Sequence, residues 1–321
     1  MTSSSGSGRS RDVTVASDLA SVPATPSAVS IGFFDGVHLG HRAIVDRALD
    51  HAASHDLRSV VVTFDRHPLQ IVRPDKVPPL LMTTARRART LAHAGPDLVV
   101  VLPFDERLRM MPPEAFIAQV LRAALDARHV VVGHNFHFGH RAAGDVDLLT
   151  AVGARDGFTV DDVELLAVDG EPISSTRIRS ALARGAVDEA TRLLGRPFVI
   201  DGTVVHGDHR GRGLGYPTAN LVVEDGVVLP APGVYAGVLE HPDGRRLPAV
   251  TSIGTNPTFN GTNLRVESYV LDFDEDLYGL QVAVDVRRFL RGQQRFAGVD
   301  ELIAAMDGDI RKARRALTDV G

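Results

Sequence analysis

Near its N-terminus the chain contains the stretch Val29-Ser30-Ile31-Gly32-Phe33-Phe34-Asp35-Gly36-Val37-His38-Leu39-Gly40-His41. A short apolar run at its start predicts a buried strand, and a turn that contains glycine follows. A helical pattern then opens, in which Ile44, Val45 and Leu49 fall on one face. Ligands of open α/β sheets bind where strands end and helices begin. The stretch therefore predicts a fold and the place of a site within it.

The residues of this turn suit a phosphate group. A helix N-terminus favours anions through its free N–H groups and its dipole. Gly36 and Gly40 let a ligand approach the backbone closely, and His38 and His41 can donate N–H groups to phosphate oxygens as charge develops. The plainer alternative is a pair of surface histidines beside an ordinary strand–helix turn.

The string Gly-x-Phe-Asp-Gly-Val-His-x-Gly-His resembles the signature of the HxGH nucleotidyltransferases, which join a nucleoside monophosphate from ATP or CTP to a phosphorylated acceptor. Its form is most similar to the prokaryotic bifunctional riboflavin kinase/FAD synthetase family. The resemblance implies that His38 and His41 are catalytic. It also implies a nucleotide- and phosphate-binding role for the rest of the motif, namely Gly32, Phe34, Asp35, Gly36 and Gly40.

Composition narrows the class of protein. A length of 321 residues is typical of two domains, and 44% hydrophobic residues are normal for a globular chain. No run approaches the ~18 apolar residues of a membrane span, and the polar leader is no secretory signal. We expect disorder up to about Arg11.

Charge and cysteine usage add further limits. A net charge of −5 argues against nucleic-acid binding, and the lack of cysteine is compatible with a cytoplasmic location. The only lysines, Lys76 and Lys312, do not follow a glycine, so a Walker A loop is absent. Any ATP chemistry must therefore use another phosphate-binding element.

The first half of the chain alternates strands and helices. Valine-rich runs at residues 59–64, 98–102 and 129–133 predict three more buried strands, and a helix is expected from Pro113 to Leu125. A spacing of roughly 30–40 residues between strands predicts a Rossmann-like parallel sheet with helices on both faces. Functional residues should then gather at the carboxyl ends of the strands.

Two segments follow predicted strands. Gly133-His134-Asn135-Phe136-His137-Phe138-Gly139 resembles the family pattern Gly-x-Asp/Asn-Phe-x-Phe-Gly, which implies that Asn135 lies near the flavin. A turn with two packing phenylalanines is the alternative. Asp65-Arg66-His67-Pro68 has Arg66 where the family often has proline, so no role is assigned to Arg66.

A second strong motif is Ile173-Ser174-Ser175-Thr176-Arg177-Ile178-Arg179. Its Ser/Thr cluster can cap a helix and leave N–H groups free for an anion. Arg179 lies about one turn beyond Thr176, and its planar fork suits phosphate. The motif resembles Ile-Ser-Ser-Thr-x-x-Arg of the same transferases, which implies that Ser174, Ser175, Thr176 and Arg179 bind nucleotide phosphate. An ordinary capped helix is the alternative.

The pattern changes in the second half. Residues 182–194 predict a helix interrupted by Gly185, and we place a domain boundary near Ala186, giving domains 1–186 and 187–321. From Phe198 to about Val299 the runs are short, β-rich and separated by glycine and proline. They predict a small antiparallel barrel, with a closing helix at residues 299–317.

The barrel half carries its own phosphate motifs. Residues 207–216 form a glycine-rich loop whose amides can bind an anion, with Gly211, Gly213 and Gly215 as the expected contacts. In Pro217-Thr218-Ala219-Asn220, Thr218 and Asn220 alternate and can point to one side. Two such oxygen ligands suit Mg²⁺ held mainly by substrate phosphates. The motif resembles the riboflavin kinase signature, and residues 252–258 and 266–269 match two further family stretches.

A base is needed if riboflavin is the acceptor, because a primary alcohol is a poor nucleophile at neutral pH. Glu267 lies in an alternating strand in which Val266 and Ser268 face the opposite side. The stretch does not show which side faces the barrel interior. The resemblance implies that Glu267 is the kinase base, and a surface glutamate is the alternative. The acidic cluster at residues 272–276 is typical of a solvated turn.

The resemblance extends over nearly the whole chain and implies two reactions. Riboflavin and ATP give FMN in the C-terminal domain, and FMN and ATP give FAD and pyrophosphate in the N-terminal domain. ATP is then a co-substrate and Mg²⁺ a cofactor. No nucleophile for a covalent intermediate is evident, so direct in-line transfer is expected.

Two other classes of function remain open. A different HxGH transferase, such as a cytidylyl- or pantetheine-phosphate adenylyltransferase, would not explain the barrel half. A flavin-binding regulatory protein that has lost catalysis would bind FMN without turning over ATP. The sequence allows a homo-oligomer but does not fix the oligomeric state, nor whether FMN passes between sites.

Overall fold

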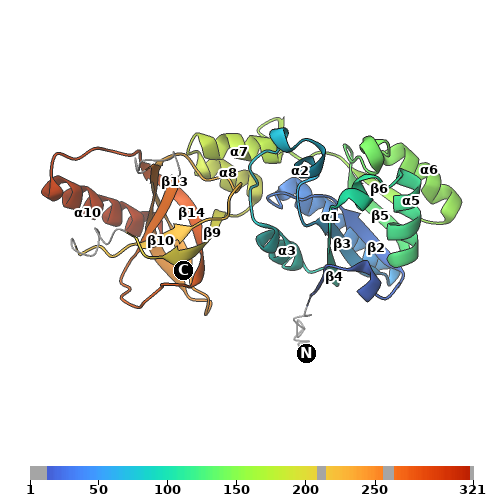
Figure 1. Cartoon of the computed structure of the whole chain (residues 1–321), viewed down its shortest axis with the longest axis horizontal. Helices are drawn as coiled ribbons and strands as arrows, with labels where there is room; N and C mark the ends of the chain where they lie inside the picture. The colour runs from blue at the N-terminus through green and yellow to red at the C-terminus, as the bar shows by residue number, and fades with distance from the viewer. Residues whose placement is uncertain (1–12, 208–214, 256–263, 319–321) are drawn as a thin grey trace, which may run out of the picture. The chain divides into compact units, whose positions relative to one another are not determined.

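The computed structural model describes residues 13–207, 215–255 and 264–318 (Figure 1). The chain divides into two compact units. The first comprises residues 1–77 and 84–172, and the second comprises residues 78–83 and 173–321. The leader up to Arg11, and the predicted phosphate contacts Gly211 and Gly213, lie outside the described residues.

The first unit is built on a six-stranded parallel sheet in the order β1-β4-β3-β2-β5-β6. Its strands are β1 (Thr14–Ala16), β2 (Ser27–Ile31), β3 (Arg58–Phe64), β4 (Leu98–Leu102), β5 (Ala127–Gly133) and β6 (Thr159–Val163). The four predicted strands are confirmed as β2 to β5. The two edge strands were not predicted, because β1 is short and β6 contains two aspartates.

Helices cover both faces of this sheet, as expected (Figure 1). The helices are α1 (Leu39–His55), α2 (Leu69–Val72), α3 (Thr84–Ala92), α4 (Glu106–Arg109), α5 (Pro113–Phe116) and α6 (Val146–Asp156). The predicted helix at 113–125 begins as α5 and continues as a π-helix, η3 (Ile117–Ala124). Three single 3₁₀ turns, η1 (Leu19–Ser21), η2 (Pro74–Lys76) and η4 (His140–Ala142), and a small ribbon of β7 (Ala167–Val168) and β8 (Glu171–Pro172) complete the unit.

The order of the strands indicates, by topology alone, where a ligand crevice is expected. From β2 the chain moves through α1 to β3 and through α3 to β4, whereas from β5 it moves the other way through α6 to β6. Right-handed crossovers then place α1 and α3 on one face and α5 and α6 on the other. The direction reverses between the neighbours β2 and β5, and ligands of such sheets bind outside the carboxyl ends at that point.

The second unit contains a closed antiparallel barrel in the order β10-β13-β12-β11-β14-β9. The strands are β9 (Phe198–Val205), β10 (Ala219–Val222), β11 (Gly233–Glu240), β12 (Arg246–Thr255), β13 (Leu264–Val270) and β14 (Gln281–Arg291). Helices α7 (Ser175–Ala183) and α8 (Val187–Leu194) precede it, and α10 (Val299–Ala316) follows. The barrel and its closing helix are confirmed.

The interruption predicted at Gly185 is present, since this glycine has φ 72° between α7 and α8. Helix α7 belongs to the second compact unit, which begins, apart from residues 78–83, at Ile173. The proposed boundary near Ala186 lies beyond that helix and stays a prediction about where the two functions divide.

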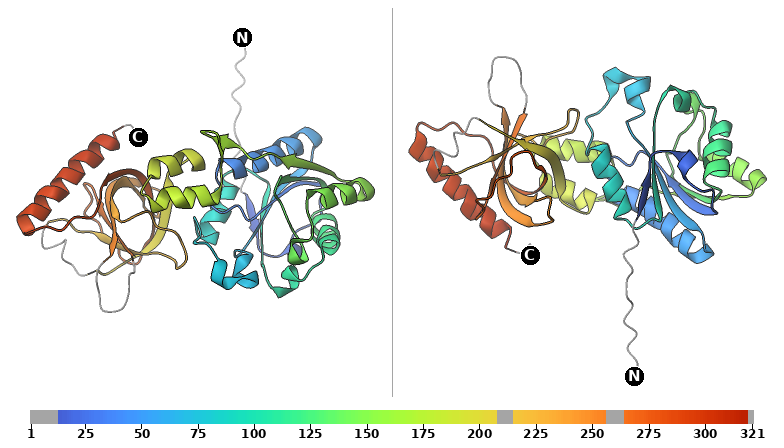
Figure 2. Two further views of the ribbon diagram at one scale, coloured as in Figure 1. Left: turned by 90° about the horizontal axis from the view of Figure 1, so that it is seen from above. Right: turned by 60° about the horizontal axis from the view of Figure 1, so that its bottom comes forward.

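Helix α10 identifies the outer face of the barrel (Figure 2). Ala313 and Leu317 at its end pack on Ala236 and Val238 of β11. Val250 of β12, the register partner of Ala236, packs against the same cluster. Residues that alternate with these are buried inside the barrel. Among the described residues, no helix is long and apolar enough to cross a membrane.

Candidate functional site

The signature loop, residues 32–41, leaves β2 along the end of β3. Gly32 donates its N–H to the Val62 carbonyl at 3.1 Å, and the Thr63 hydroxyl donates to the Phe33 carbonyl at 2.9 Å. A Cβ at Gly32 would lie 2.8 Å from the Phe34 ring, so a larger residue here would displace that ring. Strand β3 therefore fixes the start of the loop, and glycine permits its tight turn.

The turn itself holds an unusual backbone. The N–H of Val37 bonds the Phe34 carbonyl at 3.0 Å, and Phe34, Gly36 and Val37 have φ values of 55°, 83° and 39°. Left-handed backbone costs a non-glycine residue roughly 1–3 kcal/mol, and a β-branched residue such as valine adopts it rarely. Val37 and Phe34 are nevertheless fully or almost fully buried. Contacts with the surrounding structure must therefore hold the loop in this shape.

The two signature histidines are brought together at the start of α1. His38 is the N-cap, and its Nδ1 accepts the His41 backbone N–H at 3.2 Å. The two rings stack with centroids 3.5 Å apart, and the His41 ring meets the Phe34 ring edge-on at 5.3 Å. Because Nδ1 of His38 is an acceptor, the neutral ring carries its proton on Nε2 and can donate from there. A donor at this position is compatible with contact to a phosphate oxygen.

The loop after β5 lies at the same edge of the sheet. Strands β2 and β5 are neighbours, so residues 133–139 emerge beside the signature loop. A Cβ at Gly133 would lie 3.2 Å from Ile44 of α1 and 3.5 Å from the Asn135 side-chain oxygen. Asn135 is exposed there, whereas Phe138 is buried in the core. Both phenylalanines of this loop therefore pack, Phe138 within the core and Phe136 against it, while the Asn135 side chain is exposed.

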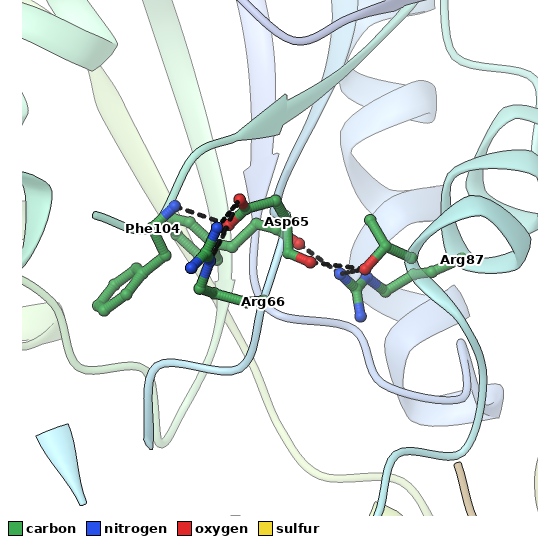
Figure 3. Close-up of polar contacts among 6 residues, drawn as sticks. Asp65, Arg66, Arg87 and Phe104 are labelled. Atoms are coloured by element: carbon green, nitrogen blue, oxygen red, sulfur yellow. Dashed lines mark hydrogen bonds and ion pairs between the residues drawn. The ribbon is translucent and has the colours of Figure 1, made fainter. Parts of the chain in front are cut away.

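The end of β3 is tied to its surroundings through Asp65 (Figure 3). The Asp65 carboxylate accepts the Phe104 N–H at 2.8 Å and pairs with Arg66 at 3.0 Å, while its carbonyl accepts the Thr84 hydroxyl at 2.6 Å. Burial opposes ionisation of Asp65, but the hydrogen bonds from Arg66 and Phe104 outweigh it and lower the pKa. Arg66, to which the sequence assigned no role, is thus the ion-pair partner of Asp65.

The second transferase motif opens α7. Ser174 is the N-cap and its hydroxyl accepts the Arg177 N–H at 3.2 Å, which confirms a capped helix start. Ser175 begins the helix and Thr176 is exposed. The Nε of Arg179 donates to the Pro79 carbonyl at 2.6 Å, and both residues belong to the second compact unit. A phosphate-binding role for these four residues stays a prediction.

Strand register assembles a second set of residues on the barrel. Asn220 of β10 lies directly opposite Glu267 of β13, and Glu267 lies directly opposite Ser252 of β12. Ser252 alternates with Val250, so all three side chains are on the outer face that carries α10. Val266 and Ser268 are buried within the barrel. The side of the strand that the sequence left open is thereby settled, and Glu267 is half-buried on the outside.

Close packing supports the residues around Asn220. A Cβ at Gly207 would lie 2.3 Å from the Asn220 side-chain nitrogen, so this position admits only glycine while Asn220 keeps its place. Tyr216 donates its hydroxyl to Asp307 of α10 at 2.7 Å, and its ring meets Tyr269 edge-on at 5.5 Å. Thr218 immediately precedes β10, and Gly215 is exposed with φ 85°. Sequence reasoning missed the part played by Gly207 and Asp307.

Within residues 13–207, 215–255 and 264–318, no group of three or more His, Asp or Glu side chains is placed to hold a metal ion by itself. Thr218 and Asn220 offer oxygen atoms beside a carboxylate, which fits a hard cation that takes its other ligands from water and substrate phosphates.

Comparison with known proteins gives consistent matches. A family model described as FAD synthetase matches residues 21–177, and one described as riboflavin kinase matches residues 194–317. The bifunctional riboflavin kinase/FMN adenylyltransferase of Pseudomonas fluorescens is 41% identical over 286 residues, covering 89% of this chain and 91% of the relative. That of Escherichia coli strain K12 is 38% identical over 301 residues, covering 92% and 95%.

A solved structure matches over a similar length. The crystal structure of a macrolide-efflux protein from Streptococcus pneumoniae superposes with a TM-score of 0.83 at 32% identity, covering 94% of this chain and 98% of that one. Both halves of the chain, with their order, therefore recur in known proteins.

Proposed function

This chain belongs to the bifunctional riboflavin kinase/FMN adenylyltransferase family, and from that premise we propose how its residues divide the two activities. FMN adenylyl transfer is assigned to the signature loop, and riboflavin phosphorylation to the outer face of the barrel. ATP is the co-substrate of both activities. The observation that supports the proposal is that the signature loop with His38 and His41 belongs to the first unit, whereas Asn220 and Glu267 belong to the second.

Adenylyl transfer joins a phosphate oxygen of FMN to the α-phosphorus of ATP and releases pyrophosphate. His38 and His41 are the residues we assign to the developing negative charge, since Nε2 of His38 is a donor and the two rings stack at the helix start. The amides and glycines of residues 32–40 bind the phosphates, and Asn135 contacts the flavin at the neighbouring strand end. Ser174, Ser175, Thr176 and Arg179 bind nucleotide phosphate.

Riboflavin phosphorylation needs a proton acceptor for the attacking hydroxyl. Glu267 is the residue we assign, because it is half-buried and directly opposite Asn220. Thr218 and Asn220 would hold Mg²⁺, which neutralises charge on the transferring phosphoryl group. Gly211, Gly213 and Gly215 bind ATP phosphates through their amides. In-line attack then moves the phosphoryl group directly from ATP to riboflavin.

The proposal also includes a functional boundary, a cellular location and an oligomeric state. We place the functional boundary near Ala186, with the transferase in residues 1–186 and the kinase in residues 187–321. A cytoplasmic location is favoured by the lack of cysteine. The sequence and the two units leave a homo-oligomer open.

The direct test is to incubate the protein with riboflavin, ATP and Mg²⁺ and to separate the flavins by chromatography. FMN should appear first and FAD after it, and omission of Mg²⁺ should stop both. A protein that binds FMN but consumes no ATP would instead be a regulatory relative. A protein that adenylylates another acceptor and ignores flavin would be a different nucleotidyltransferase.

A further inference from the structure

One buried cation beside the signature loop has no role in the two proposed reactions. Arg87, in the middle of α3, is completely buried, which is rare for an arginine unless it is paired. Its Nη2 donates to the Phe64 carbonyl and, at 3.4 Å, to the Thr84 hydroxyl (Figure 3). Arg87 thus attaches α3 to the carboxyl end of β3, the strand that fixes the start of the loop.

The same guanidinium contacts the signature loop. Its carbon lies 4.2 Å from the centre of the Phe33 ring, a cation–π contact. The His67 ring meets Phe33 edge-on at 4.7 Å. Phe33 is therefore held by α3 and by the segment after β3, one residue before the left-handed turn begins.

Charge links Arg87 to the next part of the loop. Asp35 is 3% exposed, and a buried carboxylate is costly without a positive partner. Burial lowers the pKa of Arg87 to about 10, while the charges of Asp35 and Asp65 oppose that shift, so the guanidinium stays protonated at neutral pH. A positive charge in α3 consequently faces the negative charge that the loop buries.

The hydrogen bonding of Arg87 argues against a role in stability alone. Within the described residues, its Nε and Nη1 are buried without a hydrogen-bond partner. Unsatisfied buried donors are destabilising, and an apolar side chain of similar volume often replaces a buried charge without loss of stability. What an apolar side chain could not do is hold Phe33 and Asp35 by charge.

We propose that Arg87 is a positioning residue for FMN adenylyl transfer. Through Phe33 and Asp35 it holds the strained turn from which His38 and His41 present their N–H groups. The inference rests on the function proposed for the signature loop. A displacement of about 1 Å in such donors costs roughly 100-fold in rate, so loss of Arg87 should be felt in the chemical step.

The test compares Arg87→Met, Arg87→Lys and Phe33→Leu in FAD synthesis from FMN and ATP. We expect kcat to fall about 100-fold in Arg87→Met with little change in the KM for FMN. Arg87→Lys, which keeps the charge, should recover part of that loss. Arg89→Met, on the exposed side of the same helix, is the matched control and should behave as the parent.

A double variant separates positioning from folding. If Arg87 acts through Phe33, the Arg87→Met/Phe33→Leu pair should lose no more kcat than Arg87→Met alone. Thermal melts of each variant define a temperature at which all are folded. Should Arg87→Met fail to fold, Arg87→Lys and Phe33→Leu still carry the test through their kcat. A parental kcat in folded variants, additive losses, or a change confined to KM would each overturn the proposal.

His41→Ala is assayed alongside to keep two failures apart. If His41→Ala makes FAD at the parental rate, the function proposed for the loop is wrong. If His41→Ala is impaired and Arg87→Met is not, only the inference about Arg87 fails.

Discussion

The two units bring their candidate site residues together in different ways. In the parallel sheet, His38 and His41 come from one contiguous loop, and Asn135 comes from the loop that follows the neighbouring strand. In the barrel, Asn220, Ser252 and Glu267 come from three strands and meet only because their register places them opposite one another. One site is built from strand ends, and the other is built across strands.

This difference determines which sequence changes each site tolerates. A loop at strand ends can be changed locally, and its geometry depends on a few supports such as Gly32 and the contacts of Phe33. A site across strands depends on register, where a slip of one residue would turn every side chain to the other face. Variants of the signature-loop histidines should therefore leave riboflavin phosphorylation intact, and variants of Glu267 should leave adenylyl transfer intact.

The largest expected effect is in the barrel. Glu267→Gln keeps the shape of the side chain and removes the base, so riboflavin phosphorylation should fall by ~10²–10⁴. The measurement is initial FMN formation from riboflavin, with FAD formation from supplied FMN as the internal reference. Glu224→Gln, an exposed glutamate shortly after β10, is the matched control. Parental phosphorylation by the Glu267 variant would show that it is not the base.

The next effect is in the signature loop. Loss of one charge-stabilising donor costs typically ~10²–10³ in rate, so His38→Ala and His41→Ala should each slow FAD formation by that factor. FMN formation from riboflavin should be unchanged. His55→Ala, at the far end of the same helix, serves as control. If the His38→Ala/His41→Ala double variant makes FAD at the parental rate, these histidines do not take part in adenylyl transfer.

A third prediction concerns a buried histidine near the amino ends of the parallel strands. His129 near the amino end of β5 is 2% exposed and stacks on His51 at 3.4 Å. Burial and the neighbouring His51 lower the pKa of His129 from 6.5 to about 4, although Asp161 opposes the shift. The unfolded chain therefore binds a proton between pH 6.5 and 4 that the folded chain does not. Stability should fall as the pH drops through this window, by at most about 3 kcal/mol.

Urea unfolding at pH 4.5 and pH 7 measures this dependence. His129→Gln, which cannot titrate, should have a smaller difference between the two values. An equal difference in parent and variant would mean that His129 does not contribute to the acid sensitivity.

The smallest effect on activity is expected from dividing the chain. A fragment of residues 187–321 should still phosphorylate riboflavin at close to the full-length rate, because the barrel is closed and keeps α10. A fragment of residues 173–321 also keeps α7, whose Leu182 carbonyl accepts the Ala231 N–H at 2.9 Å. The longer fragment should melt at a higher temperature. An inactive shorter fragment beside an active longer one would move the functional boundary to the start of α7.

Sequence alone predicted the positions of the signature-loop residues better than those of the barrel residues. Glycines, histidines and a capped helix start are local signals, so the places of His38, His41 and Ser174 followed from a few adjacent residues. The face occupied by Glu267 did not, because alternation defines two equivalent sides and only the packing of α10 distinguishes them. Gly207 likewise appeared as one glycine among several until the fold placed it against Asn220.

Other features were not predicted from the sequence, because their local patterns of residues are common. Strands β1 and β6 lie at the sheet edges, where a short or polar strand needs no apolar run. Arg87 lies between other arginines in α3, which in sequence suggests a solvated helix. Its one signal was the spacing to Leu91, four residues later on the same buried face.

A crossed assay shows whether this one chain holds two independent sites. The parent, Glu267→Gln and the His38→Ala/His41→Ala double variant are each given ATP and Mg²⁺ with riboflavin or with FMN, and the flavins are separated by chromatography. We predict that the glutamate variant makes FAD from FMN but little FMN from riboflavin, while the histidine variant makes FMN and stops there. Loss of both products in either folded variant, or loss of neither, would show that the two reactions do not have separate sites at these residues.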